Sequence, residues 1–195
     1  MANQVVWKKI NRVPKEDQMY VRKMRNQKSI RKWMYSTDKI STETHKRWLQ
    51  NTTTKENKIV FVIYKKSDPV GVVSVDDIDK ENKRSSWAFY IKEGHRGGGL
   101  GSLIEYNLIN FVFEELELRK LNCEVIQGND PVVKLHKKFF FEEEGFKKSE
   151  ISRGEKRKGV HVLGLTKERW KKNKKEIKKS IERIRKNFTI KIEHE

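Results

Sequence analysis

The chain has 195 residues, with 45 lysines and arginines against 27 aspartates and glutamates, and a formal net charge of +18. This length suits one domain with its own core, and the sequence shows neither a signal peptide nor an apolar run of membrane-spanning length. The single Cys123 excludes an internal disulfide and the five scattered histidines argue against a metal centre, so we expect a cytoplasmic protein without a catalytic metal.

The first third of the chain predicts one strand followed by two helices. Residues 4–10 are the candidate strand. Pro14, with acidic residues close behind it, is typical of a helix start, because proline fits the first turn and acids favour the positive end of the helix dipole. Ser41 fits the cap of a second helix, which carries His45. Residues 30–35 (Ile-Arg-Lys-Trp-Met-Tyr) form an aromatic and basic segment between these helices.

The rest of the chain up to residue 166 predicts six strands and two helices. Runs rich in β-branched and aromatic residues, bounded by turn residues, indicate the strands, and apolar runs of helical spacing indicate the helices. In chain order the strands are 58–64, 70–75 and 85–91, then 120–127 after a helix over 103–116, and finally 145–152 and 159–165 after a short helix over 132–139.

A glycine-rich segment, Gly-His-Arg-Gly-Gly-Gly-Leu-Gly-Ser over residues 94–102, joins the strand at 85–91 to an apolar helix. Glycines let the backbone approach a ligand closely, and the helix dipole favours negative charge there, so the segment predicts a pyrophosphate site. A P-loop would need a lysine after Gly101, where Ser102 stands. A dinucleotide-binding fold would place its glycines after the first strand, whereas several strands precede these.

The remaining pattern, Arg/Gln-x-x-Gly-x-Gly/Ala, is met by Arg96, Gly99 and Gly101. It resembles the acetyl-CoA pyrophosphate loop of the GNAT N-acetyltransferase superfamily, and the order β-α-α-β-β-β-α-β-α-β-β resembles that fold over residues 4–166. The resemblance implies an α/β fold with a mixed, largely antiparallel sheet, and acetyl-CoA as co-substrate. It assigns cofactor contacts to Ile91, Arg96, Gly97, Gly98, Gly99, Leu100, Gly101, Ser102, Asn129 and Lys137.

The residues after 166 form a basic segment, with eleven lysines or arginines and three glutamates over 167–186. Trp170, Ile177, Ile181, Ile184 and Phe188 recur at helical spacing, which predicts an amphipathic helix over 167–187. We therefore divide the chain into a GNAT domain at 1–166 and a basic helix and tail at 167–195. We favour a helix that lies on the domain with a solvated basic face, and place docking to an anionic surface or partner second.

Several short strings resemble a narrower group, the PseH-type N-acetyltransferases of the pseudaminic acid pathway. These enzymes acetylate the 4-amino group of a UDP-linked 4-amino-4,6-dideoxy-N-acetylaltrosamine, so the resemblance implies a UDP-amino sugar as acceptor. The strings are 21–26, 30–36, 40–45, 135–139, 141–145 and 163–170.

The residue types near these strings are compatible with that acceptor. Basic side chains can bind its two phosphates, and a flat aromatic ring can stack on uracil. Core packing is the alternative for each aromatic residue taken alone. The candidate acceptor residues are Arg31, Lys32, Trp33, Tyr35, His45 and Tyr90.

His136 is the candidate proton donor for the departing CoA thiolate. Many GNAT enzymes carry a tyrosine in a pattern like Asn-x-x-x-x-x-Leu-Tyr, and here Asn129 leads to Leu135 followed by His136. An imidazole with a pKa of about 6.5 can protonate a thiolate whose pKa is about 8.5. The alternative is a histidine that only packs or donates a hydrogen bond. The resemblance also implies an oxyanion donor at a backbone N–H near Ile91, and no general base is assigned.

Two other function classes stay open. One is a GNAT enzyme for a different amine, such as a ribosomal-type protein N-terminus, a polyamine or an aminoglycoside, although a basic enzyme suits a polycationic acceptor poorly. The other, ranked third, is a basic nucleic-acid-binding module on a non-catalytic GNAT fold, and the intact segment from Arg96 to Gly101 argues against it. A homodimer is compatible with the sequence.

Overall fold

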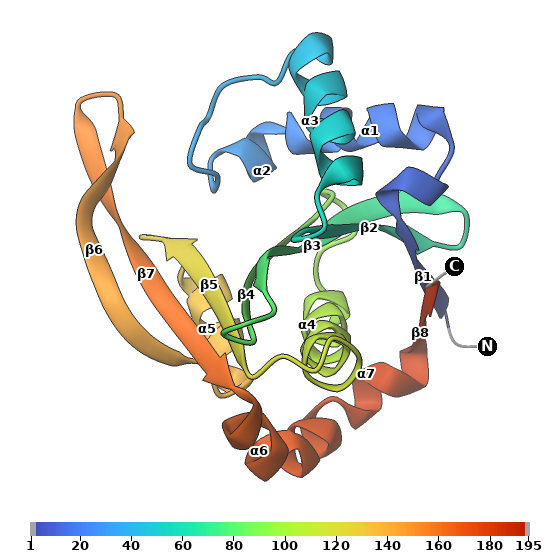
Figure 1. Cartoon of the computed structure of the whole chain (residues 1–195), viewed down its shortest axis with the longest axis vertical. Coiled ribbons are helices and arrows are strands. Elements are labelled where there is room, and N and C mark those ends of the chain that lie inside the picture. Colours follow the sequence, from blue (N-terminus) through green and yellow to red (C-terminus); the bar gives the residue numbers. More distant parts are fainter. Residues whose placement is uncertain (1–2, 194–195) are drawn as a thin grey trace.

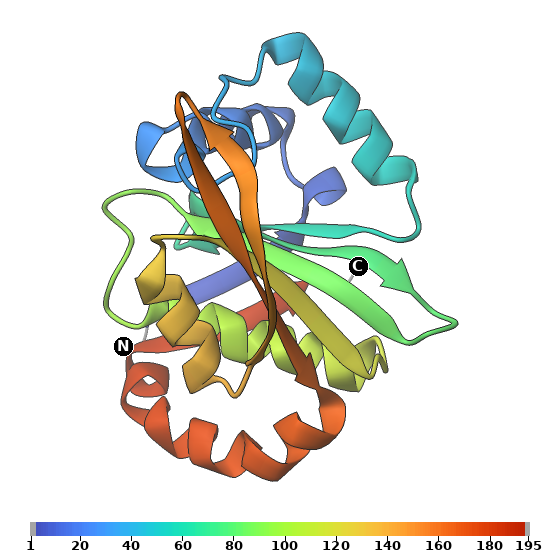
Figure 2. The ribbon, with the colours of Figure 1, turned by 90° about the vertical axis from the view of Figure 1, so that its left-hand side faces the viewer.

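The computed structural model describes residues 3–193, which form one eight-stranded mixed sheet with helices on both faces (Figures 1 and 2). The strand order is β6-β7-β5-β4-β3-β2-β1-β8. Helices α1 to α3 lie on one side of the sheet, and α4 and α7 lie on the other (Figure 1).

In chain order the elements are β1 (Asn3–Lys9), a 3-10 turn (Ile10–Arg12), α1 (Lys15–Arg25), α2 (Lys28–Arg31), α3 (Thr42–Thr54), β2 (Ile59–Lys65), β3 (Asp68–Asp79), β4 (Arg84–Ile91), α4 (Leu100–Asn110), a π-helical turn (Phe111–Glu115), β5 (Lys120–Ile126), α5 (Asp130–Lys138), β6 (Glu142–Arg153), β7 (Lys156–Thr166), α6 (Lys167–Ser180), α7 (Glu182–Asn187) and β8 (Phe188–Glu193).

The expected element order over residues 4–166 is confirmed, including the two helix starts that the sequence indicated. Pro14 directly precedes α1. The Ser41 hydroxyl caps α3 by accepting a hydrogen bond from the Thr44 N–H at 3.1 Å. Both starts depend on residues within one helical turn, which is why the sequence alone could predict them.

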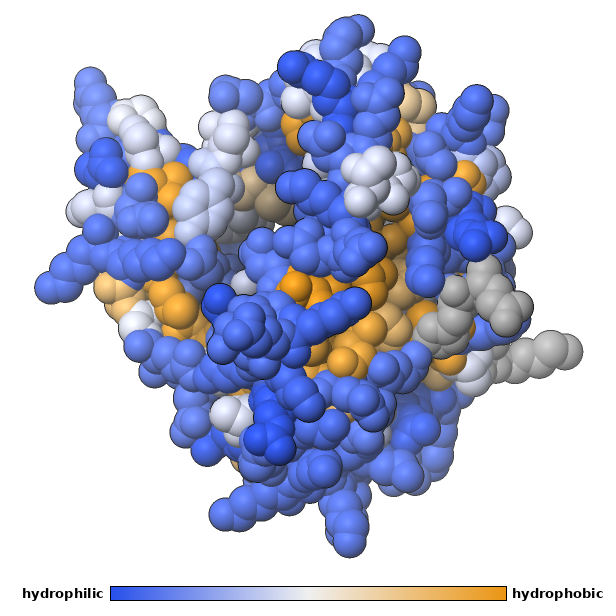
Figure 3. All heavy atoms as spheres, in the orientation of Figure 1, coloured by the Kyte–Doolittle hydropathy of each residue, from blue (hydrophilic) through white to orange (hydrophobic). Residues whose placement is uncertain are grey.

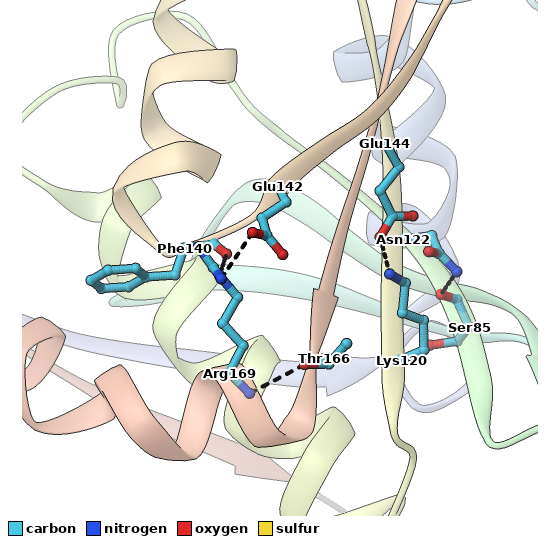
Figure 4. A network of polar contacts seen from close by, with 8 residues as sticks. All are labelled: Ser85, Lys120, Asn122, Phe140, Glu142, Glu144, Thr166 and Arg169. Atoms are coloured by element: carbon cyan, nitrogen blue, oxygen red, sulfur yellow. Dashed lines mark hydrogen bonds and ion pairs between the residues drawn. The ribbon is translucent and has the colours of Figure 1, made fainter.

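Strands β4 and β5 pair over a short stretch and then diverge. Their parallel pairing joins residues 84–86 to residues 120–122. The Asn122 side-chain amide donates to the Ser85 carbonyl oxygen at 3.3 Å across this paired end (Figure 4). Beyond it, β4 continues to pair with β3 and β5 with β7, but not with each other. In residues 87–91 and 123–126, the backbone groups on the facing sides of the two strands are therefore not used for pairing between β4 and β5.

Helix α4 is buried on both sides, because the sheet covers one face and the C-terminal segment covers the other. Leu100, Leu103, Ile104, Leu108 and Ile109 are all buried. A helix that is apolar all round needs such a double cover. In Figure 2, α6 and α7 curve beneath α4. Within residues 3–193, no helix has the combination of length and apolarity that crossing a membrane requires.

The C-terminal segment differs from the single helix that the sequence predicted. It forms α6, α7 and then β8, which pairs in parallel with β1. Trp170, Ile177 and Ile181 are buried, as the apolar stripe indicated. Residues 188–193 (Phe-Thr-Ile-Lys-Ile-Glu) alternate bulky and polar side chains and so favour a strand once β1 offers a free edge.

The start of α6 is fixed to the base of β6. The Arg169 guanidinium donates to the Phe140 carbonyl oxygen at 2.9 Å and pairs with Glu142 at 2.9 Å, and the Thr166 hydroxyl caps the helix (Figure 4). Hydrophilic side chains cover the lower part of the molecule, where α6 lies (Figure 3).

Candidate functional site

The glycine-rich segment forms a tight loop from β4 to the N-terminus of α4. Gly97, Gly98 and Gly99 have φ values of +90°, +59° and +86°. Such left-handed conformations are costly for residues with a Cβ atom, so the turn requires glycine. Gly99 is the N-terminal cap residue of α4. The N–H groups of the first helical turn have no partners within the helix, and together with the helix dipole they form a site for an anion.

Arg96 connects this loop to the end of β4. Its Nε donates to the Ile91 carbonyl oxygen at 3.0 Å, and its Nη2 lies 3.4 Å from the Ser29 hydroxyl. The Lys92 N–H donates to the Val70 carbonyl oxygen at 2.8 Å. In an antiparallel ladder, hydrogen-bonded and non-hydrogen-bonded residue pairs alternate. Because Lys92 is hydrogen-bonded to β3, the backbone N–H and C=O of the preceding Ile91 point away from β3, toward the side where β5 has diverged. This geometry supports Ile91 as the oxyanion donor, which stays a prediction.

His136, on α5, forms a buried pair with Glu105 of α4. Its Nδ1 lies 2.8 Å from the Glu105 Oε1, and the two residues are 3% and 0% exposed. Trp87 packs edge-on against the imidazole, with ring centroids 5.2 Å apart. Trp87 and Cys123 are the first residues of β4 and β5 beyond the last paired rung. His136 therefore lies where the two strands begin to separate.

The pair changes the proton affinity of the histidine. Burial by itself lowers the pKa of His136, but the attraction of the Glu105 carboxylate, helped by Cys123 and a hydrogen bond, outweighs it and raises the pKa to about 10. This direction favours the imidazolium, which is a weaker acid than the imidazole of pKa about 6.5 that the sequence led us to expect. Burial also raises the pKa of Glu105, and His136 opposes that increase. Sequence reasoning missed Glu105, although a single carboxylate within an apolar helix was a signal of a buried polar contact.

The loop from α2 to α3 faces the opposite side of the sheet and is held by β5 and by the β6–β7 hairpin. The Tyr35 hydroxyl donates to a Glu124 carboxylate oxygen of β5. The Arg153 guanidinium donates to the carbonyl oxygens of Met34 and Tyr35. These contacts place Tyr35 beside the part of β5 that does not pair with β4.

Trp33, in the same loop, is close to two lysines. The Lys32 Nζ is 5.1 Å and the Lys158 Nζ is 5.2 Å from its ring. Lys158 belongs to β7, so the ring sits between this loop and the hairpin. The predicted residues Lys32, Trp33 and Tyr35 are thus close together in the structure.

Four arginines surround this loop, and one of them, Arg22, is close enough to Glu43 to help lower the pKa of that carboxyl group. Each donates hydrogen bonds to backbone carbonyl oxygens, and none forms an ion pair in the part of the chain that the structure describes. Three of them also have a buried nitrogen without a partner: Arg22 Nε, Arg25 Nη1 and Arg153 Nε. The four are Arg22, Arg25, Arg31 and Arg153, of which the sequence reasoning found only Arg31.

Tyr90 lies beside this arginine group on β4. Its ring is partly buried, burial raises its pKa, and the nearby Arg25 opposes that increase. Burial lowers the pKa of the Arg25 guanidinium. Because the loop carries several positive charges in a partly desolvated setting, it can bind an anionic group more strongly than an exposed patch could.

Three other predicted residues have contacts of their own. The His45 Nε2 is 2.7 Å from the Gln18 carbonyl oxygen, and its ring stacks on Trp48, so its contacts are those of α1–α3 packing. The Lys137 Nζ pairs with Glu143 at 2.8 Å on the surface. Asn129 begins α5, and its side chain makes no capping hydrogen bond. His45 lies near the arginine group, since burial and the charge of Arg22 lower its pKa, whereas the ion pair of Lys137 is with Glu143.

Ile184 of α7 packs directly on Gly99, which joins the C-terminal segment to the loop. A Cβ atom built on Gly99 would lie 2.6 Å from two Ile184 side-chain atoms, whereas one on Gly97 would meet nothing within 4 Å. Both glycines have a left-handed φ. Gly97 is therefore a matched control for the backbone strain at Gly99.

We expect Gly99→Ala to lower the free energy of unfolding by about 1–3 kcal/mol more than Gly97→Ala, because only Gly99→Ala adds overpacking to strain. Urea unfolding of the two variants measures the difference. Adding Ile184→Ala to Gly99→Ala should recover part of the loss. Equal losses at the two glycines would contradict the contact.

Comparison with known proteins places this geometry among acetyltransferases. The model of the acetyltransferase (GNAT) domain family matches residues 10–162. The structure of spermidine N-acetyltransferase from Vibrio cholerae, in complex with CoA and spermine, superposes with a TM-score of 0.79 at 17% identity, over 86% of this chain and 98% of that one.

Two curated relatives are similar in sequence. The SPbeta prophage-derived uncharacterized N-acetyltransferase YokL of Bacillus subtilis (strain 168) is 25% identical over 134 residues, which cover 68% of this chain and 75% of that protein. Acetyltransferase PseH of Campylobacter jejuni subsp. jejuni serotype O:23/36 (strain 81-176) is 26% identical over 119 residues, covering 61% of this chain and 73% of that protein.

Proposed function

The chain belongs to the GNAT acetyltransferase family, and from that premise we propose that it acetylates a small amine that carries negative charge, best matched by a UDP-4-amino-4,6-dideoxy sugar. Acetyl-CoA is the co-substrate and the reaction is N-acetyl transfer. The amine that accepts the acetyl group is the part of the reaction that we propose. In this proposal the enzyme works in the cytoplasm, where Cys123 stays reduced.

The observation that carries the acceptor proposal is the group of four arginines that form no ion pair within residues 3–193. Guanidinium groups recognise phosphate by charge-assisted, often bidentate hydrogen bonds. A nucleotide sugar brings two phosphates to such a group, and its uracil can stack on Trp33. The similarity to PseH of Campylobacter jejuni supports the same class of acceptor.

A polyamine acceptor is the second candidate, because the structural neighbour from Vibrio cholerae is a spermidine N-acetyltransferase. Its 17% identity to this chain supports the fold alone. A polyamine is a polycation, and the arginine group would repel it. On the same surface Glu124 is already paired with Lys147 and Tyr35, so it offers little free negative charge. A protein N-terminus is the third candidate.

In the proposed mechanism the loop before α4 holds the pyrophosphate of acetyl-CoA, with Arg96 at its edge. The neutral amine attacks the thioester carbonyl carbon between the diverging strands. The Ile91 N–H stabilises the oxyanion of the tetrahedral intermediate. As the C–S bond breaks, His136 protonates the thiolate, and the proton of the amine leaves to solvent. Fixing both substrates in this geometry supplies much of the rate.

A thiol-release assay tests the acceptor. With acetyl-CoA present, we expect release with the UDP-4-amino-4,6-dideoxy sugar and little with spermidine or a ribosomal-type N-terminal peptide. Release with spermidine alone would favour the polyamine candidate, and release with the peptide alone would favour the protein candidate. Either result would overturn the anionic acceptor and leave the acetyl-CoA site unaffected.

Arg25→Gln should raise the KM of the sugar about 10- to 100-fold, because a hydrogen bond to a charged group contributes about 1.5–3 kcal/mol. The KM of acetyl-CoA should stay unchanged. Arg25→Lys keeps the charge and should lose less. Arg84→Gln is the control, since Arg84 pairs with Asp79 at the other end of β4. An unchanged sugar KM in Arg25→Gln would contradict the role of this arginine.

A further inference from the structure

We propose that Glu105 is the positioning residue of the reaction: it orients His136 and keeps its imidazole charged, ready to donate a proton to the departing CoA thiolate. This inference rests on the proposed role of His136. Glu105 is the only charged residue in α4, and it lies inside the core at 0% exposure. Nothing in the sequence motif or the family resemblance points to it.

Packing alone gives no reason for a carboxylate at this position. One oxygen of Glu105 pairs with the His136 Nδ1 at 2.8 Å, but the other, Oε2, is buried and has no hydrogen-bond partner among the protein residues 3–193. An unsatisfied buried acceptor costs about 1–3 kcal/mol. Apolar residues of similar size at the two positions would avoid this cost and often stabilise a core. The cost becomes understandable if the charge of the pair serves the reaction.

The hydrogen bond from Nδ1 to Glu105 leaves Nε2 as the nitrogen that would donate to the thiolate in this proposal, and the imidazole also has a side-chain hydrogen bond with Cys123. With Nδ1–H held by the carboxylate, the second proton of the imidazolium is on Nε2, at the other side of the ring. The groups that contact this ring are Glu105 from α4, Cys123 from β5, Trp87 from β4 and Phe141 before β6. Among them Glu105 is the only carboxyl group; burial raises its pKa, and the charge and hydrogen bond of His136 oppose that increase.

The proton transfer is balanced in this arrangement. The Nε2–H bond breaks as the S–H bond of CoA forms, and His136 becomes neutral. A proton from the acetylated amine, delivered through solvent, restores the imidazolium. Since the Glu105 carboxylate raises the pKa of His136 to about 10, its removal leaves burial as the dominant influence, and burial lowers that pKa.

Glu105→Gln tests the inference because its amide oxygen can still accept the Nδ1–H hydrogen bond, while the charge is gone. We expect the alkaline limb of the kcat–pH profile to move about 1–3 pH units lower, the usual effect of a nearby opposite charge on a pKa. The KM of acetyl-CoA should stay the same, and the ratio of variant to wild-type kcat should increase as the pH decreases. Glu114→Gln is the matched control, since it removes a carboxylate that pairs with Lys174 after α4. Its profile should match the wild type.

The following results distinguish the proposed positioning role of Glu105 from the proposed acid role of His136. If His136→Gln keeps full activity at every pH, His136 is not the acid and both fail. If His136→Gln loses activity while Glu105→Gln keeps the wild-type pH profile, only the inference on Glu105 is overturned. Should Glu105→Gln not fold, nitrogen-15 NMR of wild-type His136 decides: an imidazolium at pH 7.5 supports the inference, and a neutral ring overturns it.

Discussion

Replacing His136 by glutamine should lower kcat about 10²- to 10⁴-fold, the range that a positioned general acid contributes, with little change in the KM of acetyl-CoA. The histidine lies where β4 and β5 separate, and the glycine-rich loop proposed to hold acetyl-CoA is formed by other residues. Glutamine is the informative replacement, because its amide N–H can still donate to Glu105. Phenylalanine would leave that buried carboxylate without a partner, which costs about 3–5 kcal/mol and would confuse turnover with folding.

Single-turnover thiol release at saturating acetyl-CoA measures this effect directly. His161→Gln is the control, since His161 also pairs with a glutamate, Glu143 at 2.7 Å, but on the surface of β7. The control should retain wild-type turnover. A His136→Gln enzyme that turns over at the wild-type rate across the pH range would eliminate the acid role, and the thiolate would then leave without a protein donor.

The pH dependence of stability gives an independent check on the same pair. The pKa of His136 is raised in the folded protein relative to an ordinary value of about 6.5. The stabilisation from its charged form is therefore lost as the pH rises from about 6.5 through about 10. At lower pH the pair is limited by protonation of Glu105, whose pKa burial raises. His136→Gln should unfold with a flatter stability profile over that window.

The sequence predicted the parts of the site that depend on neighbouring residues. Arg96 and the glycines after it are contiguous, and the need of Gly97, Gly98 and Gly99 for a positive φ follows from their local turn. The pair of His136 with Glu105 joins residues 31 positions apart. It exists only because α4 and α5 pack together, so no local pattern could reveal it.

The loop from α2 to α3 shows the same limit over a longer range. Arg153 contacts the carbonyl oxygen of Met34 across 119 positions. Its side chain reaches the loop only because the β6–β7 hairpin lies beside it. Arg31, Lys32 and Trp33 could be proposed as acceptor residues from the sequence because they form one basic and aromatic segment. The sequence could not indicate that four arginines, rather than one, would gather around this loop.

The C-terminal segment shows how a correct periodicity can still give an incomplete structure. The spacing of Trp170, Ile177 and Ile181 predicted an apolar stripe, and all three are buried. The short strand β8 was missed because its partner, β1, lies at the opposite end of the chain. Pairing of this kind depends on which sheet edge is free after the rest has folded.

Trp170→Ala should lower the free energy of unfolding by about 3–5 kcal/mol, the usual cost of removing a buried aromatic side chain. Trp170 is 0% exposed, contacts Tyr106 and Phe139, and donates its indole N–H to the Asn110 side chain at 3.4 Å. Lys171→Ala, on the exposed side of α6, is the control and should change stability by no more than about 0.5 kcal/mol.

Urea unfolding followed by circular dichroism measures both variants. Because α4 starts at the glycine-rich loop and is covered by this segment, acetyl-CoA should stabilise Trp170→Ala less than it stabilises the wild type. Equal stability of Trp170→Ala and Lys171→Ala would mean that the segment after residue 166 is a loosely attached appendage. A large loss confined to Trp170→Ala would instead make it part of the cooperative core that holds the loop.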